Sequence, residues 1–162
     1  MKANLHRMGK VDHIAIAVRD LDSAVELYQS IFGFALLKRR EVQGKFSGMR
    51  SAEMDGGKFT IVLIEGTDPA SQVCRYVDRY GPGVQHVAIV VDNLEATARA
   101  LADSGAQFAT EIIRGDGLLQ LFTRREDNSG MMFEFIERTE AEGFQAQNIQ
   151  KLFDQLESTS AY

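Results

Sequence analysis

VDHIAIAVRDL at residues 11–21 and VQHVAIVVDNL at residues 84–94 are two copies of one stretch, and this repeat decides the fold. Six of the eleven aligned positions are identical, and a histidine stands third in each copy. An internal period is considered before local propensity because it fixes the architecture of the whole chain. With a period of 73 residues, the chain contains two similar structural units in succession.

Each copy opens a series of elements that reads βαβββ. In the first unit, a strand at 11–18 precedes a helix whose apolar residues recur at helical spacing as far as Gly33. Extended stretches follow at 34–42, 48–54 and 58–66, separated by glycine-bearing turns. The second unit repeats the order with a strand at 84–91, a helix at 93–105 and strands at 106–112, 118–126 and 131–138. The two units are predicted to share one sheet system.

Chain length favours a single α+β domain over residues 1–162, because such a chain buries roughly 70% of its unfolded surface and two independent domains would each be small. The tail places Ile149, Leu152, Phe153 and Leu156 on one helical face, so it is expected to dock onto the domain. The predicted boundaries are about 10–66 for module one, about 69–80 for an amphipathic linking helix, about 83–138 for module two and about 144–157 for the C-terminal helix.

The composition excludes several classes of partner. A formal charge of −5 provides no basic field for nucleic acid or an anionic membrane. The single cysteine, Cys74, excludes an internal disulfide framework, and no apolar run approaches the ~18 residues of a membrane helix. The N-terminal stretch lacks the apolar core of a signal peptide. We therefore expect a cytoplasmic protein with a small-molecule or protein partner.

The two repeated histidines occupy equivalent positions, each on a strand face whose neighbouring side chains are small. Side chains alternate along a strand, so His13 shares a face with Ala15 and Ala17, and His86 shares one with Ala88. The larger β-branched residues are then expected to pack under the helices. A single histidine of this kind is most often a satisfied core or surface residue. Two at equivalent places favour a shared partner, and the commonest non-protein partner of imidazole is a metal.

A third candidate ligand stands in the last predicted strand. Glu134 interrupts the apolar run MMFEFIER, where an unpaired carboxylate would be costly. Alternation places it on one face with Met132 and Ile136, while Phe133 and Phe135 point the other way. An edge-strand salt bridge is the ordinary alternative. Together with the two histidines, however, the carboxylate indicates a cation site.

The paired βαβββ units, with histidine in each first strand and glutamate in the last strand, resemble the vicinal oxygen chelate superfamily over about residues 10–157. The second half is similar to the C-terminal catalytic domain of 4-hydroxyphenylpyruvate dioxygenases. The stretches that carry this likeness are SQVCRYVDRYGPGVQH (71–86), GLLQLFTRREDNSGMMFEFIER (117–138) and GFQAQNIQKLF (143–153). The resemblance implies one cup-shaped mixed sheet, formed by both modules around a divalent metal and followed by a C-terminal helix.

Carried over by position, the metal ligands of that family fall on His13, His86 and Glu134. Its substrate-binding residues fall on Gln72, Gln120, Phe122, Met132, Phe144 and Asn148, of which Met132 replaces a phenylalanine. Polar residues that the family uses in the strands of the first unit are not apparent. Gln85 also matches a family residue, but strand alternation turns it away from His86, so it is left out of the predicted site.

The ligand set favours one chemistry within the superfamily. Two imidazoles and one carboxylate with open positions form the facial triad of non-haem Fe(II) oxygenases. Glyoxalases and methylmalonyl-CoA epimerases of the superfamily use four protein ligands, one of them in the last strand of the first unit. Superposing IVLIEG (61–66) on FEFIER (133–138) sets Val62 opposite Glu134, and valine cannot ligate. The leading hypothesis is an Fe(II)-dependent dioxygenase that combines O2 with a 2-oxo acid or a similar bidentate substrate.

Other readings of the site stay open. The metal could be Mn, Co, Ni or Zn. The stretch VDHIAIAVRDLDSAVELYQ (11–29) resembles the opening of methylmalonyl-CoA epimerases, so a metal-dependent epimerase or lyase of that or the glyoxalase type is the first alternative. A metal-free protein that sequesters a small molecule is the second, although such proteins commonly lose the ligands. A homodimer is also possible, because dimers are common in the superfamily that the chain resembles.

Overall fold

The computed structural model describes residues 8–115, 117–139 and 146–159, and within the last range the side chains of residues 150–158. The strands are β1 (Val11–Ala17), β2 (Ala35–Gln43), β3 (Gly48–Asp55), β4 (Thr60–Gly66), β5 (Gly83–Val90), β6 (Ile113–Gly115), β7 (Leu118–Phe122) and β8 (Met132–Arg138). The helices are α1 (Leu21–Ser30), α2 (Gln72–Tyr80), α3 (Leu94–Asp103) and α4 (Ala146–Thr159).

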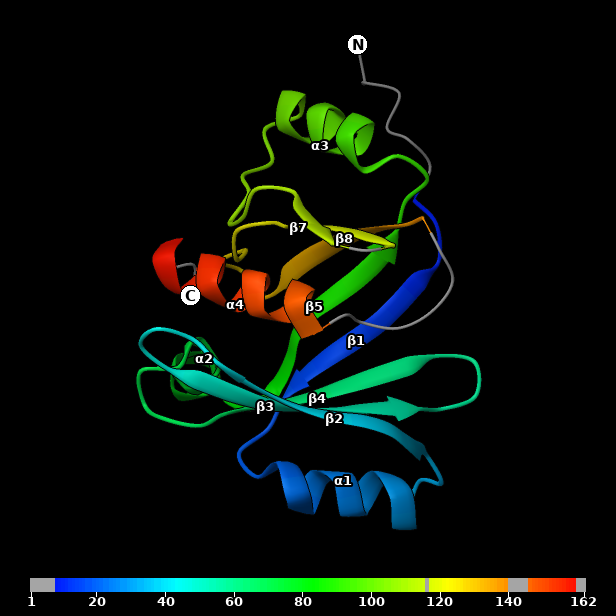
Figure 1. The fold of residues 1–162 in the computed structure, drawn as a ribbon, viewed down its shortest axis with the longest axis vertical. Coiled ribbons are helices and arrows are strands. Elements are labelled where there is room, and N and C mark those ends of the chain that lie inside the picture. Colours follow the sequence, from blue (N-terminus) through cyan, green and yellow to red (C-terminus); the bar gives the residue numbers. More distant parts are fainter. Residues whose placement is uncertain (1–7, 116, 140–145, 160–162) are drawn as a thin grey trace.

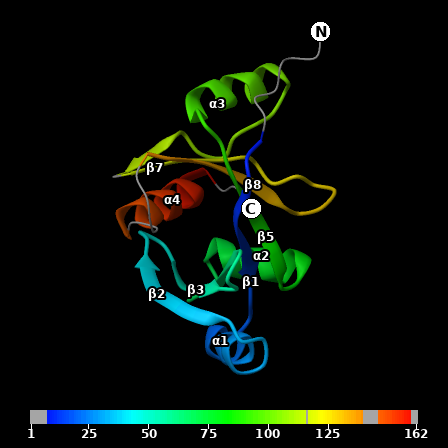
Figure 2. The ribbon, with the colours of Figure 1, turned by 90° about the vertical axis from the view of Figure 1, so that its right-hand side faces the viewer.

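The strands form one mixed sheet of eight in the order β2-β3-β4-β1-β5-β8-β7-β6. The two repeated strands, β1 and β5, lie at its centre and pair antiparallel, and each pairs parallel with the last strand of its own module, β4 or β8. The sheet curls, with α1 outside one half and α3 outside the other (Figures 1 and 2). The predicted cup of two βαβββ modules with a C-terminal helix is therefore confirmed.

The repeat extends to the way each outer helix begins. Asp20 caps α1 and Asn93 caps α3, each accepting a backbone hydrogen bond from the third residue along. The first backbone N–H of α1 donates to Glu65 at the end of β4, and the first of α3 donates to Glu137 near the end of β8, at 2.8 and 2.7 Å. In both modules a carboxylate at the end of a strand thus accepts a hydrogen bond from the positively polarised N-terminus of a helix.

Strand alternation assigns the faces of β1 as the sequence predicted. Ile14 and Ile16 pack outward against the cluster that contains Leu21 and Val25 of α1. Ala15, on the opposite face, is fully buried in the inner cluster. The large residues therefore anchor the outer helix, and small ones leave the concave side open.

One predicted strand is wrong. Residues 106–112 form no named strand; a single bridge joins Phe108 to Thr123, and the strand that pairs with β7 is the short β6. The hydroxyl of Thr110 accepts a 3.1 Å hydrogen bond from the backbone N–H of Phe122. A side chain thus replaces a backbone carbonyl as ladder partner, which interrupts regular pairing.

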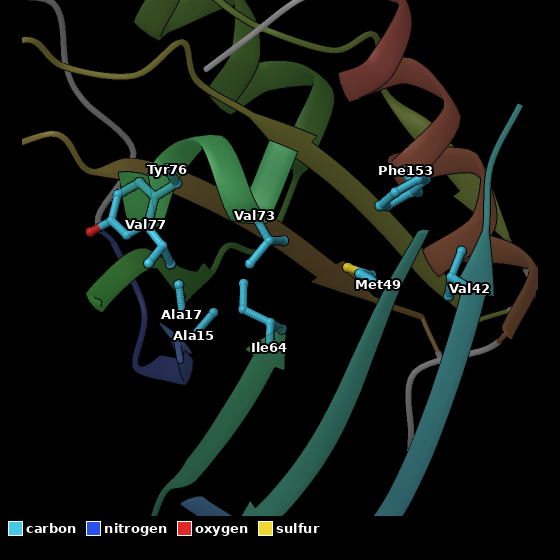
Figure 3. Packing of buried hydrophobic residues seen from close by; sticks show 9 residues of the cluster. All are labelled: Ala15, Ala17, Val42, Met49, Ile64, Val73, Tyr76, Val77 and Phe153. Carbon is cyan, nitrogen blue, oxygen red and sulfur yellow. The ribbon is translucent and has the colours of Figure 1, made fainter. Parts of the chain in front are cut away.

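Helix α4 lies between the two halves of the sheet, as predicted for a docked tail (Figures 1 and 2). It is described over Ala146–Thr159 and so continues two residues beyond the predicted end at 157, while residues 144 and 145 lie outside the described residues. Phe153 is fully buried beside Val42 and Met49 of β2 and β3, and Leu156 packs with residues of module two (Figure 3). Gln150 donates to the carbonyl of Gln43, and the ammonium of Lys151 donates to that of Arg114, each at 3.0 Å. The helix therefore bridges both modules.

Among the helices within the described ranges, none is long and apolar enough to cross a bilayer.

Candidate metal centre

The central strands bring the three predicted ligands together on the concave face. His13 on β1 and Glu134 on β8 are both register partners of Ala88 on β5, so the three residues form a row across adjacent strands. His86 lies two residues before Ala88 on the same strand. Because Ala88 is fully buried and small, the longer side chains on either side of it can converge.

The donor atoms of these side chains form a compact triangle. His13 Nε2 lies 3.3 Å from His86 Nε2 and 3.2 Å from Glu134 Oε2, and His86 Nε2 lies 3.5 Å from the same oxygen. With metal–ligand bonds of about 2.1 Å, neighbouring donors stand about 3.0 Å apart in octahedral and about 3.4 Å apart in tetrahedral coordination. The spacing therefore suits one small divalent cation.

Glu134 supplies an independent indication of a cation. Its side chain is 1% exposed, and its Oε1 accepts a 2.7 Å hydrogen bond from the amide of Gln120. Its Oε2 is buried and lies 3.2 Å from His13 Nε2 and 3.5 Å from His86 Nε2. A buried carboxylate oxygen is costly unless a cation lies beside it. In the free protein the protonated His13 can supply that charge, and a metal ion would supply it in the loaded site. The residues present thus fit a metal.

The protonation of the two imidazoles agrees with this arrangement. Burial disfavours the charged form of His13, but hydrogen bonds to Asp12 and Glu134 and the charges of these two carboxylates outweigh it and raise its pKa to about 9. Burial, with smaller contributions from His13 and Arg125, lowers the pKa of His86 well below its ordinary value. Without a metal, His13 therefore carries a proton at neutral pH. A metal ion that binds the three donor atoms would have to displace this proton.

Each ligand histidine is held at its other ring nitrogen by the residue before it. His13 Nδ1 donates to Asp12 at 3.0 Å, and His86 Nδ1 donates to Gln85 at 2.6 Å. The prediction that Gln85 points away from His86 is wrong. The β1–β5 register advances by two residues on β5 where it advances by one on β1, so Gln85 is the extra residue of a β-bulge. A bulge interrupts alternation and re-aims the side chain.

A pocket adjoins the triangle, and its lining includes the three donors, Gln120 and Leu152 of α4. Arg40 and Ser51, cross-strand partners on β2 and β3, also line it. The polar residues that the family uses in the strands of module one were not apparent in the sequence, so Arg40 and Ser51 were missed. Their regular alternation with Val42 and Met49 on the inner face was the available signal.

Val62 occupies the place of a fourth ligand, as the superposition of the two modules predicted. It pairs with Ala15 on β1, just as Glu134 pairs with Ala88 on β5. Val62 lines the same cavity as the donors but offers no ligand atom. Module one therefore contributes only His13 to the triangle.

A second pocket also borders His86 and is lined by Gln72, Gln85, Phe122 and Met132 together with Phe153 and Leu156 of α4. The ring of Phe122 meets His86 edge-on, with centroids 5.4 Å apart. Gln72 is 3% exposed, and no described residue forms a hydrogen bond with its Oε1. Of the predicted substrate-binding residues, Gln72, Gln120, Phe122 and Met132 thus surround the candidate centre. Phe144 and the side chain of Asn148 lie outside the described residues.

Comparison with known proteins places these features in one family. The model of the glyoxalase/bleomycin resistance protein/dioxygenase superfamily matches residues 10–135. A 4-hydroxyphenylpyruvate dioxygenase of Pseudomonas aeruginosa is 28% identical over 184 aligned residues, which cover 91% of this chain and 51% of that protein. The chain spans about half the length of such relatives.

Solved structures agree with the sequence matches. A variant of 4-hydroxymandelate synthase from Streptomyces coelicolor superposes with a TM-score of 0.85 at 26% identity, over 95% of this chain and 55% of that one. Methylmalonyl-CoA epimerase from Mycobacterium tuberculosis superposes with a TM-score of 0.67 at 30% identity, over 80% and 88% of the two chains. These relatives are enzymes with different reactions. The chain belongs to the glyoxalase/bleomycin resistance protein/dioxygenase superfamily.

Proposed function

We propose that the protein is a non-haem Fe(II)-dependent dioxygenase that acts on a 2-oxo acid or another substrate with two adjacent oxygens. The observation that carries the proposal is the triangle of His13, His86 and Glu134 with Val62 in the fourth place. Three ligands on one side of a metal leave open positions for a bidentate substrate and O2. The likeness to 4-hydroxyphenylpyruvate dioxygenase and 4-hydroxymandelate synthase supports the same reaction class.

The side chains around the triangle fit the handling of such a substrate. Bound iron would polarise the chelated oxygens and activate O2, while the protein would orient the substrate and exclude water. Gln120 keeps Glu134 in place through a 2.7 Å hydrogen bond. Arg40 and Ser51 offer polar contacts to an anionic substrate from the opposite wall. Phe122 and the inner face of α4 give its apolar part a dry surface.

A metal-dependent epimerase is the second candidate, and the 30% identity to a methylmalonyl-CoA epimerase favours it. Such an enzyme would stabilise an enolate after proton abstraction and would not consume O2. Against it stands Val62, which gives the metal no fourth protein ligand.

Oxygen uptake tests the proposal. The protein is purified anaerobically, loaded with Fe(II) and supplied with a panel of 2-oxo acids, beginning with aryl pyruvates. We expect O2 uptake in a one-to-one ratio with CO2 release, and loss of both in His86→Ala. Exchange of the substrate's α-proton with solvent deuterium without O2 uptake would instead identify the epimerase.

A further inference from the structure

The residues before the two ligand histidines are presented in the same unusual way. Asp12 and Gln85 hold equivalent positions in the repeat. The β1–β5 ladder shifts register at each of these two residues. Asp12 is the extra residue on β1, between Val11 and His13. Gln85 is the extra residue on β5, opposite Ala15 and Ile16. Each strand thus carries a bulge at the residue before its histidine, and each bulged side chain turns back to the imidazole.

The contacts made by these side chains determine which nitrogen of each neutral ring carries the proton. A carboxylate can only accept a hydrogen bond, so the 3.0 Å contact with Asp12 requires a proton on His13 Nδ1. Gln85 Oε1 takes the corresponding 2.6 Å contact from His86 Nδ1. With Nδ1 protonated, a neutral imidazole has its lone pair on Nε2, the atom that faces the triangle.

Asp12 is itself clamped from the other module. Arg138, on β8, donates from Nε and Nη2 to the two carboxylate oxygens of Asp12, both at 2.9 Å. The strand β5 lies between β1 and β8, so this bidentate pair spans three strands. The Asp12 side chain is only 11% exposed. Charge-assisted bidentate pairs combine strength with fixed geometry, so the orientation of Asp12 depends on how the modules meet.

We propose that Asp12, clamped by Arg138, is the principal positioning residue of the metal centre, and that the bulged Gln85 plays the weaker equivalent role for His86. The inference rests on the proposed metal site. It adds that contact between the modules through Arg138 tunes metal affinity by way of Asp12. Gln85 should orient His86 less strongly, because its amide is neutral and no arginine fixes it among the contacts described.

Cobalt binding tests this without reliance on turnover. Apoprotein is titrated with Co(II), and the dissociation constant is measured for wild type, Asp12→Ala, Asp12→Asn and Arg138→Met. Removal of a group that orients a metal ligand typically weakens binding by about 10–100-fold, which is the loss expected for Asp12→Ala. Asp12→Asn should lose less because its amide oxygen still accepts from His13. Arg138→Met should weaken binding, and Arg138→Lys should restore part of it.

A second readout separates positioning from general stability. In the Co(II) protein, the Nδ1–H protons of His13 and His86 should give two exchangeable, paramagnetically shifted proton NMR signals. Asp12→Ala should move one of them or lose it to solvent exchange. The control is Arg50→Met, which removes another arginine–carboxylate pair, 2.7 Å from Glu65 on the outer face, and should leave affinity and both signals unchanged.

The outcomes are distinguishable. Failure of the wild type to bind Co(II) would refute the metal centre itself. Tight wild-type binding with unchanged affinity and unchanged signals in both Asp12→Ala and Arg138→Met would overturn only the positioning role. If Asp12→Ala does not fold, Asp12→Asn and the two Arg138 variants decide the question by the same measurements.

Discussion

His13 determines how the candidate centre responds to pH. Its pKa is raised from 6.5 to about 9 by Asp12 and Glu134 against the opposing effect of burial, so the free protein holds this proton at neutral pH. A raised folded-state pKa stabilises the apoprotein fully below pH 6.5, and that stabilisation is lost as pH rises through about 9. A metal needs the neutral imidazole and must displace the proton.

Metal binding near pH 7.5 should therefore release about one proton, and affinity should rise about tenfold per pH unit up to about pH 9. His86, whose pKa lies well below its ordinary value, should release none. Calorimetric titration with Zn(II) in two buffers of different ionisation enthalpy counts the protons. An affinity that stays flat between pH 6.5 and 8.5 would contradict this picture of His13.

Arg40 is the charged side chain that should distinguish acidic substrates. It is 8% exposed, lines the cavity beside the donors and contacts Glu53 at 3.1 Å. A hydrogen bond to a charged group contributes about 1.5–3 kcal/mol, so Arg40→Met should raise KM for a carboxylate substrate by about 10–100-fold with less effect on kcat. The control is Glu53→Gln, which removes the ion pair but keeps the guanidinium. Equal KM values for wild type and Arg40→Met would exclude substrate contact.

At the scale of elements, regular alternation was enough to predict the faces of the central strands. It placed His13 with Ala15, and Glu134 away from Phe133 and Phe135, because those strands keep a period of two. It failed at Gln85 and gave no sign of Asp12, since a bulge depends on the partner strand and leaves no mark in one strand's own pattern. The interrupted pairing at Thr110 escaped prediction for a similar reason.

Helix α4 should control access to the cavities without holding the metal. Phe153 is fully buried against module one, and truncation of such a side chain costs about 3–5 kcal/mol when the site cannot collapse. In Phe153→Ala we expect α4 to exchange its amide hydrogens faster and KM to rise. The Co(II) dissociation constant should stay unchanged because the ligands lie on β1, β5 and β8.

Hydrogen exchange followed by mass spectrometry reports on α4 directly. Asp154→Ala, an exposed change on the same helix, serves as the control and should behave as wild type. Loss of metal affinity in Phe153→Ala would show that α4 supports the centre itself rather than covering it.

At the scale of the whole molecule, the internal repeat allowed the architecture to be predicted from sequence alone. The two copies of one stretch predicted two βαβββ modules in one sheet system, and the resemblance to a superfamily supplied the cup shape. That the two copies pair antiparallel at the centre of the sheet is a finding of the structure. Alternation with Val42 and Met49 could have placed Arg40 and Ser51 on the inner face, but not beside the donors, because that depends on how far the sheet curls. The role of Arg138 was hidden likewise, since Asp12 is 126 residues away.

The matched registers of the two modules give a prediction about Val62. Because it pairs with Ala15 as Glu134 pairs with Ala88, Val62→Glu should offer the metal a fourth ligand. We expect Co(II) to bind at least as tightly as in wild type while O2 uptake falls by more than about tenfold, since a position for substrate or O2 is filled. Val62→Gln, a weaker ligand of similar size, should be less impaired. Wild-type O2 uptake in Val62→Glu would contradict the assumed geometry.

The most direct test of the central claim is an anaerobic titration of the apoprotein with Fe(II) followed by a 2-oxo acid, observed by visible absorption. Chelation of Fe(II) through two adjacent oxygens produces a charge-transfer band, so the measurement reports both the metal and its open positions. We expect a band that saturates at one Fe(II) per chain in wild type and is absent in His86→Ala and Glu134→Ala. Stoichiometric iron binding without a band for any 2-oxo acid, or an undiminished band in His86→Ala, would contradict it.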